Sequence, residues 1–446
     1  MTGIAQKVLK LSRRPEARHV GILTSGSIAA QVALIATAPL LSRLYHPAAY
    51  GVFSLMLTIS TIGGAIGGLC YEVAVILPRS RRRAIGLYWL AFYLSFLTPA
   101  VMIGLVALVQ HFVPRIFGRP LSPDFYYYCF AGTTLTTLVN VLSYAHSRVM
   151  QFAAVSVSKF SQTLFPAIGQ IALAYVGMGN EGLLMGRVLG MAGSVAWLCH
   201  KLPRGFRLCD FAAAGPLTLY AAGKSYRDFL YQVPRQLLVR SGTSLPSALV
   251  LGSYGPVAAG LYFFATRLIE RPGMLLGDSL TRVPMRQFAA RVQKRQKLTR
   301  SSILYTAAMG VPVIGGVILL ALTAHPLFRI IFGVRWESAA DYSVVLAWWA
   351  AVRLTSLPMA TLTTVLRVQK MSLYVDVLFS FRVVIIPILA HFHFDAISAV
   401  TAFCGLSIVY HLVIVAVGLW AAMRYDRALS PVAAPFDALP TGETYV

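Results

Sequence analysis

Two short stretches of this chain repeat one another: Tyr45-His-Pro47-Ala-Ala49-Tyr-Gly51-Val-Phe53 and Tyr254-Gly-Pro256-Val-Ala258-Ala-Gly260-Leu-Tyr262. The tyrosine, proline, alanine, glycine and final aromatic residue match without a gap. Each copy joins two long hydrophobic runs, although proline and glycine also mark tight turns of any kind. We interpret the match as an internal repeat, which predicts two halves built from the same unit and pointing the same way.

Hydrophobic runs long enough to cross a bilayer core of about 30 Å recur along the whole chain. Hydrophobic residues make up 57% of the 446 residues and charged residues only 12%, with a mean hydropathy of +0.69, which excludes an ordinary soluble domain. Runs of this length are helices, because a closed barrel would show short alternating strands. The sequence predicts an all-α polytopic membrane protein with about twelve transmembrane helices in two six-helix bundles around a central cavity. The expected spans are residues 20–42, 50–78, 84–112, 124–147, 152–177, 181–202, 225–252, 255–281, 300–324, 338–366, 370–393 and 396–423.

The 39 Lys and Arg residues are distributed unevenly between the two sets of loops. Twenty-seven fall on the side of the termini and five on the opposite side. By the positive-inside rule both termini are cytoplasmic. Topology thereby explains the net charge of +24, and nucleic acid is not an expected partner. The predicted division is a basic N-tail at 1–19, an N-lobe at 20–202, a linker at 203–224, a C-lobe at 225–423 and a C-tail at 424–446.

Seven arginines and no lysine lie inside the hydrophobic runs. They are Arg187, Arg235, Arg240, Arg267, Arg271, Arg353 and Arg382. A charge at the bilayer centre costs at least about 2.5–3.5 kcal/mol on insertion scales, so such residues normally face a bundle interior or a water-filled cavity. A planar guanidinium matches phosphate through two parallel hydrogen bonds. We therefore predict a diphosphate-binding cavity lined by these arginines. The competing explanation is that they snorkel to an interface or form structural ion pairs.

The depths of the arginines support one shared site. At a rise of about 1.5 Å per residue, Arg235 and Arg271 would lie about 15 Å from the cytoplasmic end. Arg240 and Arg267 would lie about 21–22 Å from that end. Arg235 and Arg240 belong to one predicted span, and Arg267 and Arg271 belong to the next, antiparallel one. Each depth therefore holds one arginine from each span.

Acidic residues inside the runs are fewer than the arginines. They are Glu72, Glu270, Asp278 and Asp376, which leaves an excess of positive charge. Asp376 and Glu270 are candidate sites for a coupling ion, H+ or Na+, whereas an ion pair of Asp376 with Arg367, Lys370 or another helix is the simpler alternative. No resident cofactor or metal is expected, since the five cysteines are scattered and His391-Phe-His393 has no third ligand nearby.

Further motifs accompany the two copies of the repeat. They are Pro39-Leu-Leu-Ser-Arg43, Tyr71-Glu72-Val-Ala74, Tyr226-Arg-Asp228-Phe229, Arg267-Leu-Ile-Glu-Arg-Pro272 and Phe332-Gly333-Val-Arg-Trp336. In these motifs the chain resembles the polysaccharide-biosynthesis transporters, the Wzx-type O-antigen and oligosaccharide flippases of the multidrug/oligosaccharidyl-lipid/polysaccharide superfamily. The resemblance covers most of the length. It implies two bundles in a V shape and a central cavity that alternates between the two faces of the bacterial inner membrane.

The resemblance also implies a function. The expected protein is not an enzyme but a flippase that moves undecaprenyl-diphosphate-linked oligosaccharide from the cytoplasmic to the periplasmic leaflet, for O-antigen, exopolysaccharide or capsule. Its expected partners are that lipid-linked oligosaccharide, membrane lipids, a glycan polymerase and a chain-length regulator, and it is expected to act as a monomer.

Two alternatives remain open. A cation-coupled multidrug exporter of the same superfamily would favour acidic residues for cationic drugs, and the arginine excess argues against it. A polytopic glycan polymerase or glycosyltransferase would need a sizeable hydrophilic segment with acids or histidines, and no segment of the chain has this composition.

Overall fold

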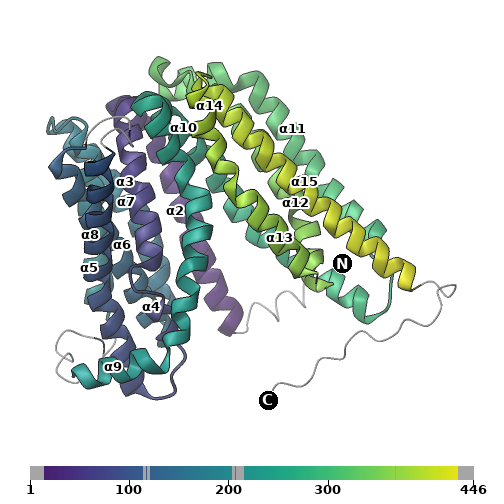
Figure 1. Ribbon diagram of the computed structural model, residues 1–446, viewed down its shortest axis with the longest axis horizontal. Coiled ribbons are helices and arrows are strands. Elements are labelled where there is room, and N and C mark those ends of the chain that lie inside the picture. The colour runs from purple at the N-terminus through teal and green to yellow at the C-terminus, as the bar shows by residue number, and fades with distance from the viewer. Residues whose placement is uncertain are drawn as a thin grey trace. The chain divides into compact units, whose positions relative to one another are not determined.

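The computed structural model describes residues 15–113, 117, 121–202, 206, 215–366 and 368–429. Their side chains are described from Ser25 onward, except for those of 271–280, 282, 283, 369, 370 and 373. Within these ranges every regular element is a helix (Figure 1). The chain divides into two compact units: unit 1 is Met1–Ala265, His325–Ala340 and Ile386–Ala396, and unit 2 is Thr266–Ala324, Asp341–Ile385 and Ile397–Val446. The predicted lobe boundaries at 20–202 and 225–423 stay a prediction.

The helices follow the predicted hydrophobic runs. The long ones are α2 (Pro15–Leu44), α3 (Pro47–Ile66), α5 (Arg81–Phe112), α6 (Pro123–Arg148), α7 (Phe152–Tyr175), α8 (Glu181–His200), α10 (Gln232–Gln293), α11 (Thr299–Phe332), α12 (Ala339–Val365) and α15 (Ala396–Ala428). Shorter elements are α4 (Tyr71–Ala74), α9 (Pro216–Ser225), α13 (Gln369–Ser380), α14 (Ile385–His391) and the 3-10 turns η2 (Arg227–Tyr231), η3 (Val334–Trp336) and η4 (Phe381–Val384). The helix α10 covers two predicted runs, which meet at Gly255.

Among the described residues, nine helical segments are long and apolar enough to cross a membrane. The all-α, multi-pass membrane fold is therefore confirmed. Helices α6 and α7 match predicted runs but are not among the nine. In α6 a row of buried threonines, including Thr133 and Thr137, donates to carbonyl oxygens one turn back, at 2.7 and 2.9 Å. Hydropathy underestimates such a helix, because the hydroxyls of Thr133 and Thr137 are satisfied by its own backbone.

The two copies of the sequence repeat meet inside unit 1. A Cβ atom on Gly51 would lie 2.0 Å from the carbonyl oxygen of Pro256, and a Cβ atom on Gly260 would lie 1.8 Å from that of Pro47. The glycine of each copy thus lets its backbone touch the proline of the other copy. This reciprocity is what a twofold axis between the copies requires, and it supports the internal repeat.

The chain breaks its helix in the same way before each of these prolines. His46, which precedes Pro47, is extended, with φ −79° and ψ 154°. Gly255, which precedes Pro256, has φ 84° and ψ 178°, a conformation that glycine alone adopts at little cost. A residue before proline avoids the helical region, and proline at the start of a helix loses no hydrogen bond. Each copy is therefore a helix break followed by a helix start.

Aromatic side chains pack against this crossing. Trp336 follows α11 in the 3-10 turn η3, is fully buried, and donates from Nε1 to the carbonyl oxygen of Ser42 at 2.7 Å. Its ring centroid lies 4.3 Å from that of Phe264 and 5.0 Å from that of Tyr50. One indole thereby connects α2, α3 and α10 within unit 1.

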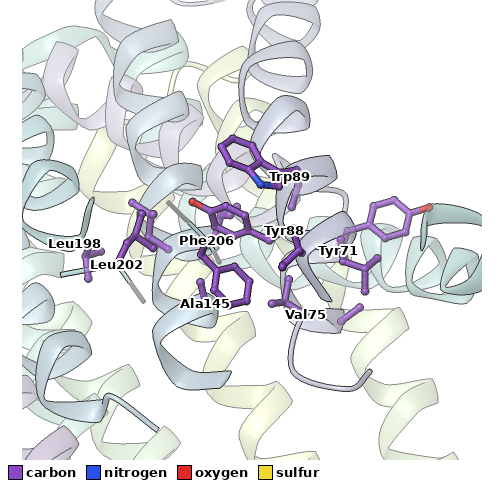
Figure 2. Close-up of a cluster of buried hydrophobic side chains, with 14 of the residues drawn as sticks. Tyr71, Val75, Tyr88, Trp89, Ala145, Leu198, Leu202 and Phe206 are labelled. Atoms are coloured by element: carbon purple, nitrogen blue, oxygen red, sulfur yellow. The ribbon is translucent and has the colours of Figure 1, made fainter. Parts of the chain in front are cut away.

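A second core of unit 1 lies where side chains from α4, α5, α6 and α8 converge (Figure 2). Tyr88 packs edge-on against Trp89 and Phe206, with centroids 5.4 and 5.2 Å away. Arg148, at the end of α6, donates to the carbonyl oxygens of Val75 at 2.8 Å and Pro78 at 2.7 Å. These bonds satisfy carbonyl groups in the segment that follows the short helix α4.

The Gly260→Ala substitution tests the crossing. The added methyl group meets backbone, which has little room to move, so we expect a loss of about 1–3 kcal/mol of stability. The matched control is Gly405→Ala in α15, where a Cβ meets nothing within 4 Å. The control should be neutral or stabilising by about 0.5–1 kcal/mol. The measurement is the Tm of the purified protein in detergent, and equal Tm values for the two variants would contradict the close approach.

Candidate functional site

Polar and charged side chains from four helical segments meet in unit 2. We call this set the unit-2 polar cluster; it comprises Glu270, Arg353, Ser356, Asp376, Arg382, Tyr410 and His411. The residues come from α10, α12, α13 with η4, and α15, and all of them lie within candidate membrane spans. Charged groups inside spans are costly and mark functional sites more often than not.

Arg353 forms one side of the cluster. Its Nη1 lies 4.0 Å from Oε1 of Glu270, and its guanidinium carbon lies 5.9 Å from the ring centroid of Trp349. The Arg353 side chain is 35% exposed, whereas that of Glu270 is 12% exposed. A contact of 4.0 Å is at the outer limit of an ion pair. An acceptor at hydrogen-bonding distance would therefore compete well for this guanidinium.

Arg382 forms the other side and sits in the 3-10 turn η4 between α13 and α14. Pro387, four residues after Val383, cannot donate to the Val383 carbonyl, and its ring would clash with that carbonyl in a straight helix. The resulting break fixes the position of Arg382. Its Nη1 donates to the carbonyl oxygen of Phe379 at 3.0 Å, and its guanidinium lies 5.1 Å from the Tyr410 ring centroid.

The Nε atom of Arg382 is buried and has no hydrogen-bond partner among the residues that the structure describes. A buried donor without an acceptor costs about 1–3 kcal/mol, and more when the group is charged. An anionic oxygen placed beside this guanidinium would recover that energy. Arg382 is therefore suited to hold an anion.

Asp376 accepts a hydrogen bond from the hydroxyl of Tyr410 at 2.6 Å. The predicted alternative, an ion pair with Arg367 or Lys370, falls on side chains outside the described residues. The carboxylate of Asp376 also lies within electrostatic reach of Arg382. Asp376 and Glu270 thus each lie near one arginine of the cluster.

His411 connects the two sides. Its Nδ1 lies 3.1 Å from Oγ of Ser356. The imidazole ring also lies within electrostatic reach of both Arg353 and Arg382. Tyr410 and His411 were not among the site residues predicted from the sequence. The sequence signal that could have indicated them is the presence of two adjacent polar rings in the otherwise apolar run 396–423.

The remaining predicted site residues lie elsewhere. Arg187, on α8 in unit 1, donates to the carbonyl oxygen of Gln162 on α7 at 3.1 Å, and its role in the site stays a prediction. Arg267 is partly buried in unit 2, and the side chain of Arg271 lies outside the described residues. The shared cavity of arginines from both units stays a prediction.

The depths predicted for Arg235 and Arg240 stay predictions, although the α-helix that carries them begins later than expected. The helix α10 begins at Gln232 rather than near 225, because α9 and η2 occupy residues 216–231. Arg235 therefore lies about 5 Å from the start of α10, and Arg240 about 12 Å. Arg240 acts electrostatically on Tyr144, as does Glu72. Glu72 is buried, and its Oε2 has no hydrogen-bond partner within the described part of the chain.

Comparison with known proteins identifies the family. Residues 40–341 match the family described as polysaccharide biosynthesis protein. The match covers more than half of the chain, and the chain belongs to this family. The resemblance in the sequence motifs is thereby confirmed. No curated protein matches the chain.

Solved transporter structures share the fold. The structure is similar to the lipid II flippase MurJ in an inward closed conformation, with 10% identity over 91% of this chain and 90% of that chain and a TM-score of 0.61. It is also similar to a multidrug resistance MATE family transporter of the MOP superfamily. The inward-facing form gives 14% identity, 92% and 96% coverage and a TM-score of 0.55; the outward-facing form gives 15%, 95%, 99% and 0.52. At these identities the likeness shows the fold alone.

The Tyr410→Phe substitution tests the cluster. It removes the hydrogen bond to Asp376, and because the acceptor is charged we expect a loss of about 1.5–3 kcal/mol. The control Tyr374→Phe, on α13, removes a hydroxyl from a residue that is 75% exposed and should leave stability unchanged. Combining Tyr410→Phe with Asp376→Asn in a double-mutant cycle isolates the pair. A coupling energy near zero would show that the two residues do not interact.

Proposed function

We propose that this protein is a flippase that carries a polyprenyl-diphosphate-linked oligosaccharide across the bacterial inner membrane by alternating access. Membership of the polysaccharide biosynthesis family supports a glycan as part of the substrate. The observation that carries the proposal is the presence of two arginines, Arg353 and Arg382, in one polar cluster within candidate membrane spans. Arginine pairs with the oxygens of a diphosphate through parallel charge-assisted hydrogen bonds.

The acids of the cluster fit a carrier that must also exist without substrate. An unpaired arginine within a membrane span is costly, and Glu270 and Asp376 lower that cost for Arg353 and Arg382. We propose that the diphosphate displaces Glu270 from Arg353. The carboxylate then loses that counter-charge and takes up a proton or a sodium ion. Substrate binding and ion binding would thereby be coupled, and an H+ or Na+ gradient would drive transport.

Substitutions of Arg353 test the diphosphate site. Arg353→Ala should lower transport about 10- to 100-fold, since charge-assisted hydrogen bonds contribute about 1.5–3 kcal/mol. Arg353→Lys should restore it in part, because an ammonium group keeps the charge and loses the fork. The control is Arg329→Ala, an exposed arginine near the end of α11. Surface glycan in a complemented deletion strain is the readout, with membrane insertion checked by immunoblot.

Unchanged surface glycan for Arg353→Ala would remove the proposed diphosphate site. The deletion strain also separates the function classes. Lipid-linked oligosaccharide should accumulate in the inner leaflet, whereas a multidrug exporter would instead change the sensitivity to cationic drugs. Glycosyl transfer by the purified protein would show an enzyme.

Cross-linking tests alternating access. Nη1 of Arg335 lies 3.2 Å from Nε2 of His46, beside the repeat crossing, and the two residues belong to different predicted lobes. A short bis-methanethiosulfonate reagent, which joins two cysteines through reducible disulfides, should stop transport when it links His46→Cys to Arg335→Cys, because the outer side then cannot open. Reduction should restore transport, and each single variant should be unaffected by the reagent. Full activity of the cross-linked protein would show that residues 46 and 335 need not separate during transport, and would exclude an opening between them.

A further inference from the structure

The short helix α9 runs crosswise to the long helices at one end of unit 1 (Figure 1). It crosses α5 at Gly86, where a Cβ atom would lie 3.1 Å from both the Thr218 carbonyl oxygen and the Ala222 Cβ. The hydroxyl of Tyr71 donates to the carbonyl oxygen of Gly223 at 3.4 Å. The long helices cross the bilayer, so a helix crosswise to them at their end lies along the membrane plane.

This helix has two different faces. On the inner face Ala222 is buried, and Leu219 packs against the core shown in Figure 2. On the outer face Leu217 and Tyr220 are 84% and 69% exposed, and Lys224 is exposed as well. Spacings of three and four residues place these three side chains on one stripe. The outer stripe therefore combines an apolar side chain, an aromatic side chain and a cation.

Neighbouring residues extend the same character. In the turn η2, Tyr231 is 81% exposed and Arg227 is exposed. Arg82 and Arg83, in the first turn of α5, are exposed about one helical turn before Gly86. Across residues 75–90 and 215–231, Asp228 is the one acidic residue. The surface is thus basic, with exposed apolar side chains between the charges.

We propose that the outer face of α9, together with η2 and the first turn of α5, binds the head groups of anionic phospholipids. Leu217, Tyr220 and Tyr231 would enter the boundary between head groups and acyl chains, where leucine and amphipathic rings are favoured. Lys224 and Arg227 would contact lipid phosphates. The predicted topology places this end at the cytoplasmic leaflet, which carries the anionic lipid. Lipid binding here would hold the segment between the two predicted lobes against α5, whichever substrate the protein carries.

Hydrogen exchange of the full-length protein in lipid nanodiscs tests this binding. Nanodiscs of phosphatidylcholine alone are compared with nanodiscs of equal parts phosphatidylcholine and phosphatidylglycerol. Amides of residues 216–231 should exchange more slowly in the anionic nanodiscs. The effect should correspond to about fivefold for each basic residue at the surface and should shrink as salt is added. The variant Lys224→Gln/Arg227→Gln should lose it, and Lys224→Arg/Arg227→Lys should keep it.

Equal exchange of these amides in the two lipid mixtures would overturn the proposal. The proposal would also be wrong if the glutamine variant kept the full lipid effect. Exchange that is fast in both nanodiscs and slows only with a cytosolic fraction would assign this face to a protein partner instead. The wild-type comparison decides without any variant, so a variant that fails to fold leaves the test intact. Flippase activity does not enter the measurement.

Discussion

The hydrocarbon core of a membrane offers no hydrogen-bond partners, and every polar group within it must find one in the protein. Much of this structure follows from that constraint. Trp336 donates to the carbonyl oxygen of Ser42, and the threonines of α6 donate to their own helix. At the end of α6, Arg148 donates to carbonyl groups in the segment that follows the short helix α4. The same constraint singles out Arg382, whose buried Nε has no acceptor in the described residues.

Close packing of backbones is the second determinant. Lipid tails are as apolar as leucine, so helices in a membrane associate through fit and polar contacts rather than through hydrophobic burial alone. At the repeat crossing, Gly51 and Gly260 supply that fit by bringing backbone into contact with backbone. Because the contact is reciprocal, one short motif used twice builds both sides of it. The bulky ring of Trp336 then fills the space beside the glycines.

The unit-2 polar cluster shows how a membrane protein can keep arginines within its spans. Arg353 lies 4.0 Å from Glu270, at the outer limit of an ion pair, and Arg382 lies within electrostatic reach of Asp376. Tightly paired charges would gain stability and lose the ability to bind a ligand, whereas unpaired charges would be costly to keep there. The helix break at η4 and the hydrogen bond from Tyr410 to Asp376 hold this balance in place. Ligand binding therefore favours loosely paired arginines, whereas the stability of the fold favours closely paired ones.

The sequence by itself determined the class, the helices and the two copies of the repeat. Hydropathy and helix breaks are local properties, and each residue contributes to them independently of distant ones. The arginines within the runs were also visible, since a charge in an apolar run stands out without knowledge of its neighbours. The start of α10 was misplaced, because residues 227–231 form the 3-10 turn η2, which hydropathy does not distinguish from the α-helix that follows.

Only the tertiary structure decided which charges meet. It brought Arg353 and Arg382 into one cluster with His411 and Tyr410, and it left Arg187 as a contact between α7 and α8. The rotation of each helix about its axis sets these contacts, and packing against distant helices sets that rotation. No local pattern in the chain encodes it.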